Sequence, residues 1–188
     1  LPLSIRRQRQ MCIRDSPNTV QRACQAAASL GVWMINVHAA GGQKMLEAAA
    51  NAIAQVSVPP LLIGVTVLTS LQEKDLLAMG INLSLTSLVL KRANMVKEAG
   101  LDGVVCSAQE TVAIKKNLGK QFLTVTPGIR FQEDNKYDDQ MRIMTPKKAF
   151  EAGSDYLVIG RPITQAKDPL AKLQQIRLIQ LAVSESFS

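Results

Sequence analysis

The sequence predicts an α/β fold built on a parallel sheet, and three observations support this prediction. Five short apolar segments alternate with helical segments along most of the 188 residues. These segments are apolar almost throughout, which is typical of parallel strands covered on both faces. Polar residues follow directly after the strand segments, where α/β folds bind their ligands. Both a doubly wound sheet and a (β/α)8 barrel fit this pattern, although no G-x-G-x-x-G motif follows any strand.

The predicted elements follow one another regularly from Pro17, a residue type suited to the first turn of a helix. The Ala-rich first helix ends at Gly31. The predicted strands cover residues 32–38, 61–68, 101–106, 122–126 and 156–159. The later helices are expected at residues 43–55, in a short segment before residue 80, at 85–99, at 108–118, from 145 onward, and in an amphipathic segment containing Leu170, Leu173, Ile176, Ile179 and Val183. Five strands cannot close an eight-stranded barrel, so the count predicts that strands are missing on the N-terminal side.

Residues 1–16 differ from the rest of the chain. Gln, Arg and Ser dominate this segment, and neither helical nor strand periodicity holds across it. We therefore expect a foreign or disordered segment at 1–16 and one partial β/α barrel domain at 17–188.

Composition and charge exclude several classes of function. The net charge is +7, but residues 1–15 hold +3 of it and the remaining Lys and Arg are scattered along helices. With only seven aromatic residues there is no stacking platform, so we expect no binding to nucleic acid. No apolar run reaches membrane-spanning length, so no membrane association is expected either. Cys24 and Cys106 lie in apolar segments, which favours buried thiols in a reducing cytoplasm.

The last predicted strand ends in an arrangement that suits an anion. An apolar run is followed by Gly160, Arg161 and then Pro162, which opens a predicted helical turn. Glycine lets a ligand approach the backbone closely, and the planar guanidinium of arginine matches phosphate. The same octapeptide also fits an ordinary strand-to-helix turn with a surface arginine.

Several motifs, in order, together resemble the bacterial branch of the orotidine 5′-phosphate decarboxylase family. The matching stretches are PNTV (17–20), GVWMINVHAAGG (31–42), LLIGVTVLTSL (61–71), GLDGVVCSAQE (100–110), VTPGIR (125–130), DQMRIMTP (139–146) and YLVIGRPIT (156–164). The resemblance implies a (β/α)8 TIM barrel, incomplete here with about five of its eight strands. It also implies a homodimer that converts orotidine 5′-phosphate to UMP and CO2, in de novo pyrimidine biosynthesis, without cofactor or metal.

The resemblance also implies which residues bind the substrate. The phosphate-binding residues of the family match Arg130, Gln140, Gly160 and Arg161. Three further residues match ligand contacts of the family, the last at the pyrimidine end: Thr19, Thr69 and Ser107. Glu110, at the start of a predicted helix, is interpreted as a carboxylate that stabilises the helix dipole.

The resemblance breaks at the catalytic residues. The family carries an Asp-x-Lys-x-x-Asp motif just before its P-N-T motif, and its Lys protonates the carbon that loses CO2. Alignment on P-N-T places Gln10 at the first Asp, Cys12 at the Lys and Asp15 at the last Asp. A thiol cannot present a fixed ammonium, so we expect an N-terminally truncated or chimeric chain that is inactive, with Asp15 as its one candidate catalytic residue.

Two alternatives remain open. The parent protein could be a different phosphate-binding β/α-barrel enzyme, and the absence of the Asp-x-Lys-x-x-Asp motif is also consistent with that alternative. This chain could also be a non-catalytic fragment that binds a nucleotide phosphate.

Overall fold

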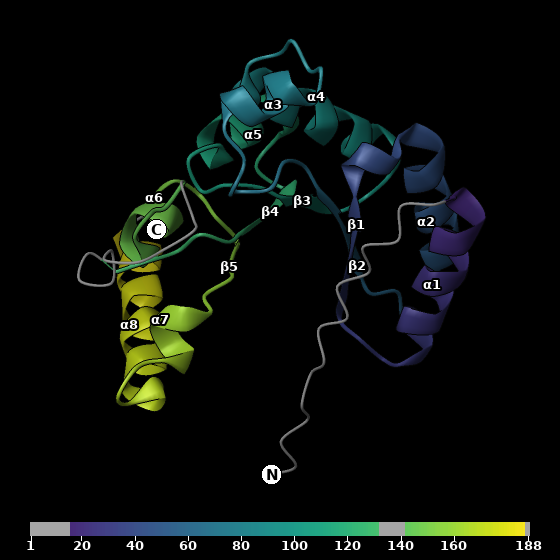
Figure 1. The fold of residues 1–188 in the computed structure, drawn as a ribbon. Helices are drawn as coiled ribbons and strands as arrows, with labels where there is room; N and C mark the ends of the chain where they lie inside the picture. Colours follow the sequence, from purple (N-terminus) through teal and green to yellow (C-terminus); the bar gives the residue numbers. More distant parts are fainter. Residues whose placement is uncertain (1–15, 132–141, 187–188) are drawn as a thin grey trace. The chain divides into compact units, whose positions relative to one another are not determined.

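The computed structural model describes residues 16–131 and 142–186, which form an α/β structure with one five-stranded sheet (Figure 1). The strand order is β1-β2-β3-β4-β5, and β1 pairs with β2, as β4 does with β5, in parallel. The strands are β1 (Met34–His38), β2 (Leu61–Val65), β3 (Gly103–Val105), β4 (Leu123–Thr126) and β5 (Tyr156–Leu157). All five predicted strands are present, each somewhat shorter than its apolar run.

The predicted helices are also present between the strands. They are α1 (Pro17–Ser29), α2 (Gln43–Ala54), α3 (Glu73–Ala78), α4 (Leu85–Glu98), α5 (Thr111–Leu118), α6 (Pro146–Glu151), the short α7 (Arg161–Thr164) and α8 (Pro169–Ser186), with a 3-10 turn η1 (Ala39–Gly41) after β1. None of the helices in the described part of the chain is both long and apolar enough to cross a bilayer.

The chain divides into two compact units. Of the described residues, the first unit comprises 16–66 and 92–104, and the second comprises 67–91, 105–131 and 142–186. Strands β1 and β2 therefore belong to the first unit, and β4 and β5 belong to the second.

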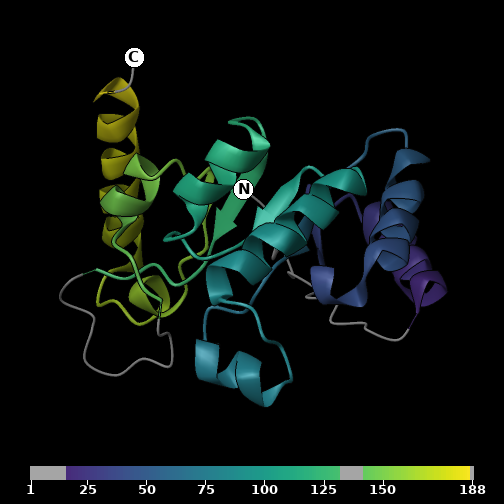
Figure 2. The ribbon, with the colours of Figure 1, turned by 90° about the horizontal axis from the view of Figure 1, so that it is seen from above.

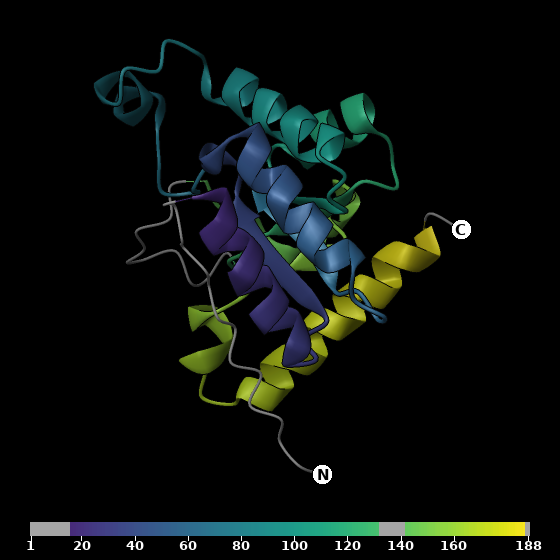
Figure 3. The same ribbon diagram turned by 90° about the vertical axis from the view of Figure 1, so that its right-hand side faces the viewer.

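The first unit packs α1 against α2, and α2 against β2 (Figure 3). Helix α1 begins at Pro17 because the Ser16 hydroxyl accepts a hydrogen bond from the Thr19 N–H at 3.2 Å. Cys24 on α1 and Leu46 on α2 are both fully buried. Gly64 in β2 faces Val96 of α4, and a Cβ built on Gly64 would lie 2.3 Å from a Val96 methyl group. The absence of a side chain at residue 64 therefore allows α4 to pack closely on the strand.

The second unit has a small core under its last helices. Ala108, Ile129 and Ala149 are buried together, and Met144, Leu157 and Ile159 pack against them. Helix α6 begins at Pro146, where the Thr145 hydroxyl accepts from the Lys148 N–H at 3.4 Å. Helices α6 and α7 both pack against α8 (Figure 2).

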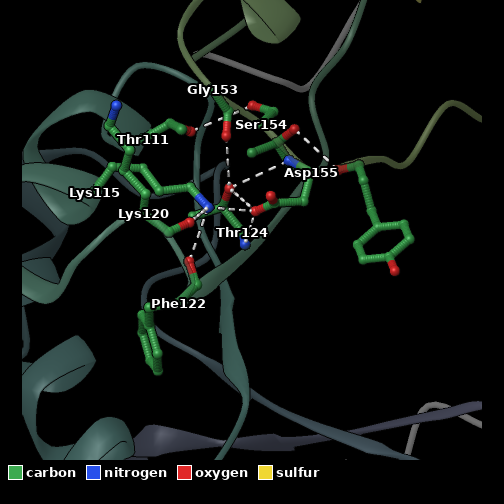
Figure 4. A network of polar contacts seen from close by, with 10 residues as sticks. Thr111, Lys115, Lys120, Phe122, Thr124, Gly153, Ser154 and Asp155 are labelled. Atoms are coloured by element: carbon green, nitrogen blue, oxygen red, sulfur yellow. Dashed lines mark hydrogen bonds and ion pairs between the residues drawn. The ribbon is translucent and has the colours of Figure 1, made fainter.

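A polar network joins α5 to β4 and to the start of β5 within the second unit (Figure 4). One oxygen of Asp155, Oδ2, accepts from Lys115 Nζ at 2.6 Å, from the Thr124 N–H at 2.7 Å and from the Thr124 hydroxyl at 2.9 Å. Lys115 Nζ also donates to the carbonyls of Lys120 and Phe122, both at 2.9 Å. Asp155 precedes β5, so this network lies at the amino end of that strand. The predicted ligand residues follow the carboxyl ends of the strands, at the opposite edge of the sheet.

Helix α8 is present where the amphipathic pattern predicts it, but little of its apolar face is covered. Leu170 is 71% exposed and Leu173 is 47% exposed, whereas Val183 is buried. Ile176 and Ile179 are half-buried. The pattern predicted the helix correctly, and its partners α6 and α7 cover only part of the apolar face.

Candidate functional site

The predicted ligand residues of the second unit follow four successive strands of the sheet. Thr69 comes after β2, Ser107 after β3, Arg130 after β4, and the Gly160-Arg161 pair after β5. Because these strands run parallel, their carboxyl ends belong to the same edge of the sheet. Thr69, Ser107 and Arg130 are buried, at 7%, 0% and 7% exposure. Polar side chains buried at strand ends are typical of a ligand site rather than of a core.

The segment after β5 has the local structure predicted for the anion cradle. Gly160 precedes α7, and its carbonyl accepts from the Ile163 N–H at 2.9 Å and from the Thr164 N–H at 3.1 Å. A Cβ built on Gly160 would meet no atom within 4 Å, so this glycine leaves open space beside the backbone. Arg161 is exposed at the first position of the turn. The order strand, glycine, arginine and helical turn is confirmed, and phosphate binding by it stays a prediction.

Arg130 is held in place by its own loop. Its Nη1 donates to the Ile129 carbonyl at 2.8 Å, and its backbone N–H donates to the Met144 carbonyl at 3.0 Å. Met144 in turn donates its N–H to the Gly128 carbonyl at 3.2 Å, so Ile129 and Met144 form a parallel bridge. The backbone on both sides of residues 132–141 is therefore joined next to Arg130.

Two charged residues that sequence reasoning did not place in the site lie beside Ser107. Arg142 Nη1 forms an ion pair with Glu110 Oε1, and the two side chains are only 11% and 6% exposed. The other oxygen of Glu110, Oε2, accepts from the Ser107 N–H at 2.9 Å. Arg142 Nη2 donates to the Leu68 carbonyl at 2.9 Å and lies 3.4 Å from the Val67 carbonyl. Glu110 therefore does more than favour the dipole of α5, because it links Ser107 to a buried arginine.

Burial dominates the electrostatics of this region. Loss of hydration lowers the pKa of Arg142. Burial raises the pKa of the Cys106 thiol to about 12, opposed in part by a hydrogen bond to Thr111 and by the positive charge of Arg142. In the first unit, burial raises the pKa of Cys24 to about 11. Both thiols are free and buried, and both pKa values lie well above neutral pH.

Of the remaining predicted site residues, one belongs to the first unit and the others are not described. Thr19 is in the first turn of α1 in the first unit, where its hydroxyl lies 2.9 Å from the Ser16 hydroxyl. Gln140, Asp15 and the Cys12 position lie outside the described residues. Among residues 16–131 and 142–186, no group of three or more His, Cys, Asp or Glu side chains could hold a metal ion.

Comparison with known proteins gives a consistent result. Residues 13–176 match the model of the family described as orotidine 5′-phosphate decarboxylase / HUMPS. An orotidine 5′-phosphate decarboxylase of Neisseria meningitidis serogroup C is 52% identical over 165 residues, covering 88% of this chain and 67% of the relative. That of Saccharophagus degradans is 57% identical over 162 residues, covering 86% and 68%. The chain thus spans about two thirds of the length of these relatives.

Solved structures agree with the sequence relatives. The orotidine 5′-phosphate decarboxylase of Lactobacillus acidophilus superimposes with a TM-score of 0.76 at 39% identity, over 90% of this chain and 72% of that one. An uncharacterized conserved protein from Geobacillus kaustophilus gives the same TM-score and identity, over 90% and 74%. The enzyme from Pyrococcus horikoshii, 20% identical with a TM-score of 0.67 over 89% and 70%, supports the fold alone. The predicted α/β barrel class, present here as a partial barrel of five strands, is confirmed.

Proposed function

Because the chain belongs to the orotidine 5′-phosphate decarboxylase / HUMPS family, we propose that it binds a pyrimidine nucleoside monophosphate, orotidine 5′-phosphate or UMP. The parent enzyme is then a carboxy-lyase that converts orotidine 5′-phosphate to UMP and CO2. The observation that carries this proposal is the placement of Thr69, Ser107, Arg130 and Gly160-Arg161 after four successive parallel strands, each at a position of a family motif.

The residue types suit the two ends of such a ligand. A phosphate dianion is bound best by guanidinium groups and backbone N–H groups. We assign Arg130, Gln140, Gly160 and Arg161 to the phosphate. Binding energy from that end, remote from the reacting carbon, can be used to lower the barrier of decarboxylation.

Smaller polar residues are assigned to the rest of the nucleotide. We assign Thr69 and Thr19 to the nucleotide and Ser107 to the pyrimidine end. Ser107 is fully buried and its backbone is already bonded to Glu110, so it would meet the ligand with little reorganisation.

Nucleotide binding can be tested on Arg161, whose side chain is exposed at the start of α7. We expect UMP to bind in calorimetric titration and Arg161→Gln to weaken it by about tenfold or more, because a charge-assisted bond to phosphate is lost. Arg177→Gln, at an exposed position on α8, is the matched control and should leave the affinity unchanged. A wild-type chain that binds inorganic phosphate as tightly as UMP would favour another phosphate-binding barrel enzyme. No binding of either ligand at millimolar concentration would contradict the proposal.

We propose further that this chain does not catalyse decarboxylation. Cys12 stands at the position that aligns with the catalytic Lys. A thiol carries no positive charge that could stabilise a carbanion, and it has no ammonium proton to give to the carbon. Incubation of the chain with orotidine 5′-phosphate, followed by its ultraviolet absorbance, should show no loss of substrate beyond a protein-free control. Turnover that disappears in Arg161→Gln would contradict this expectation. Asp15 stays a candidate residue without an assigned step.

Two further properties follow from the family proposal. A homodimer stays a prediction for this chain of 20.4 kDa. We place the protein in the cytoplasm, which is supported by the free, buried thiols of Cys24 and Cys106.

A further inference from the structure

The buried ion pair between Arg142 and Glu110 lies at a junction of three loops in the second unit. These are the loops that follow β2, β3 and β4, and each carries one of the predicted ligand residues: Thr69, Ser107 or Arg130. Neither member of the pair is among the residues assigned to the nucleotide above.

The guanidinium of Arg142 holds the loop after β2. Its Nη2 donates to the Leu68 carbonyl at 2.9 Å, one residue before Thr69. Leu68 also accepts from the Leu71 N–H at 3.0 Å, so the same carbonyl closes the turn around Thr69. Arg142 thus binds the backbone on which the Thr69 side chain depends.

The carboxylate of Glu110 holds the loop after β3. Its Oε2 accepts from the Ser107 N–H at 2.9 Å, while the Glu110 N–H donates to the Ser107 carbonyl at 3.0 Å. The Ser107 hydroxyl accepts from the Gln109 N–H at 3.3 Å. Ser107 is therefore bonded through its N–H, its carbonyl and its hydroxyl, and Glu110 makes two of these bonds.

The backbone near Arg142 holds the third loop. Met144, two residues later, exchanges hydrogen bonds with Gly128 and Arg130. Gln109 Nε2 lies 3.4 Å from the Ile143 carbonyl and joins the same segment to the loop after β3. A single stretch, residues 142–144, therefore touches all three loops.

The chemistry of the pair suits a fixed support. Both side chains are nearly excluded from water, so their attraction is little screened. The planar fork of arginine can donate to a carboxylate from one nitrogen and to carbonyls from the other, which the single Nζ of a lysine cannot do with the same geometry. Replacing only one partner would leave a buried charge unpaired and destabilise the whole unit.

We propose that Arg142 and Glu110 form a positioning pair, which fixes the backbone after β2 and β3 so that Thr69 and Ser107 are in place before the nucleotide arrives. The identity of the ligand rests on the function proposed above, whereas the ordering of the two loops does not. The pair acts through other residues and is not itself assigned to the substrate.

The ordering of the loops can be tested without any ligand. The double variant Arg142→Met/Glu110→Met removes both charges together and keeps side-chain volume, so no charge remains buried without a partner. We expect the Ser107 and Leu71 amides to exchange with deuterium about tenfold faster or more, as local opening becomes easier. The Leu71 amide is the decisive reporter, because neither substituted side chain is its hydrogen-bond acceptor.

A matched control pair lies on α6. Lys147 and Glu151 form an ion pair at 3.8 Å with side chains 69% and 44% exposed, so Lys147→Met/Glu151→Met should leave both amides at wild-type rates. Unchanged exchange of Leu71 in the Arg142→Met/Glu110→Met variant would overturn the proposal. Equal acceleration in β1, for example at Val37, would show a general loss of stability and would also overturn it.

The role in binding is tested by comparing two ligands. In Arg142→Met/Glu110→Met, UMP affinity should fall by about tenfold or more while inorganic phosphate affinity stays within about twofold. The substitutions remove side-chain bonds to the loops of Thr69 and Ser107, whereas Arg130 is bonded to the backbone of Met144, which they leave in place. Arg142→Lys keeps the ion pair but not the planar fork, so its UMP affinity should lie between those of the wild type and the double variant.

The outcomes separate the two proposals. If the affinities for UMP and phosphate fall together, or if neither falls, the pair does not position the nucleotide contacts. If the wild-type chain binds no UMP, the proposed function fails, and deuterium exchange at Leu71 still decides whether the pair orders the loops.

Discussion

Asp155→Ala is expected to destabilise the chain by about 3 kcal/mol, because one carboxylate oxygen accepts three hydrogen bonds of roughly 1 kcal/mol each (Figure 4). Its partners are Lys115 Nζ and both donors of Thr124, a residue with no exposed surface. The Asp155 side chain is 30% exposed, so the charge attraction itself adds little to this value. Urea unfolding at pH 7, followed by circular dichroism, measures the difference in the free energy of unfolding.

Two variants make the Asp155 result specific. Asp155→Asn keeps an oxygen acceptor but loses the charge, so its loss of stability should be smaller. Glu151→Gln breaks only the exposed ion pair with Lys147 on α6 and should cost less than about 0.5 kcal/mol. A loss below about 1 kcal/mol for Asp155→Ala would show that water replaces the three bonds without penalty.

Gly64→Ala should cost about 2 kcal/mol, even though alanine is normally tolerated in strands. The new Cβ would lie 2.3 Å and 2.8 Å from the two methyl groups of Val96, which is fully buried and β-branched. Neither side chain can rotate away, so α4 or β2 must shift. The free energy of unfolding of the purified variant, again measured in urea, checks the value.

A double-mutant cycle tests the physical cause of the Gly64 effect. Val96→Ala removes the two clashing methyl groups, so Gly64→Ala should cost much less in that background than in the wild type. Gly41→Ala is the control, because its Cβ would meet Met45 Cε at 2.2 Å, and the flexible methionine can change rotamer. Equal costs for Gly64→Ala in both backgrounds would place the strain somewhere other than Val96.

The order and type of the elements were predictable from local patterns. Each strand is a short apolar run, and each helix has a local start or stop signal, such as Ser16-Pro17 before α1 and Thr145-Pro146 before α6. The candidate ligand residues could be found for the same reason. Thr69, Ser107, Arg130 and Arg161 each come within four residues of the end of a strand, and the ends of parallel strands meet at one edge of a sheet.

Other features depended on residues that are distant in the chain. Arg142 and Glu110 are 32 residues apart, and Arg142 and Leu68 are 74 residues apart. No local pattern shows that such groups meet, and Glu110 alone fits a helix start equally well. The exposed leucines of α8 make the same point, since periodicity predicts an apolar face but not what covers it.

Local patterns in the chain predict which segments become strands and helices and which polar residues follow the strands, because these depend on neighbours a few residues away. Only the folded chain shows that Glu110 binds Ser107 and Arg142, that Asp155 binds Lys115 and Thr124, and that Gly64 leaves space for Val96. Each of these depends on the distance between side chains from different elements, and folding is what sets that distance.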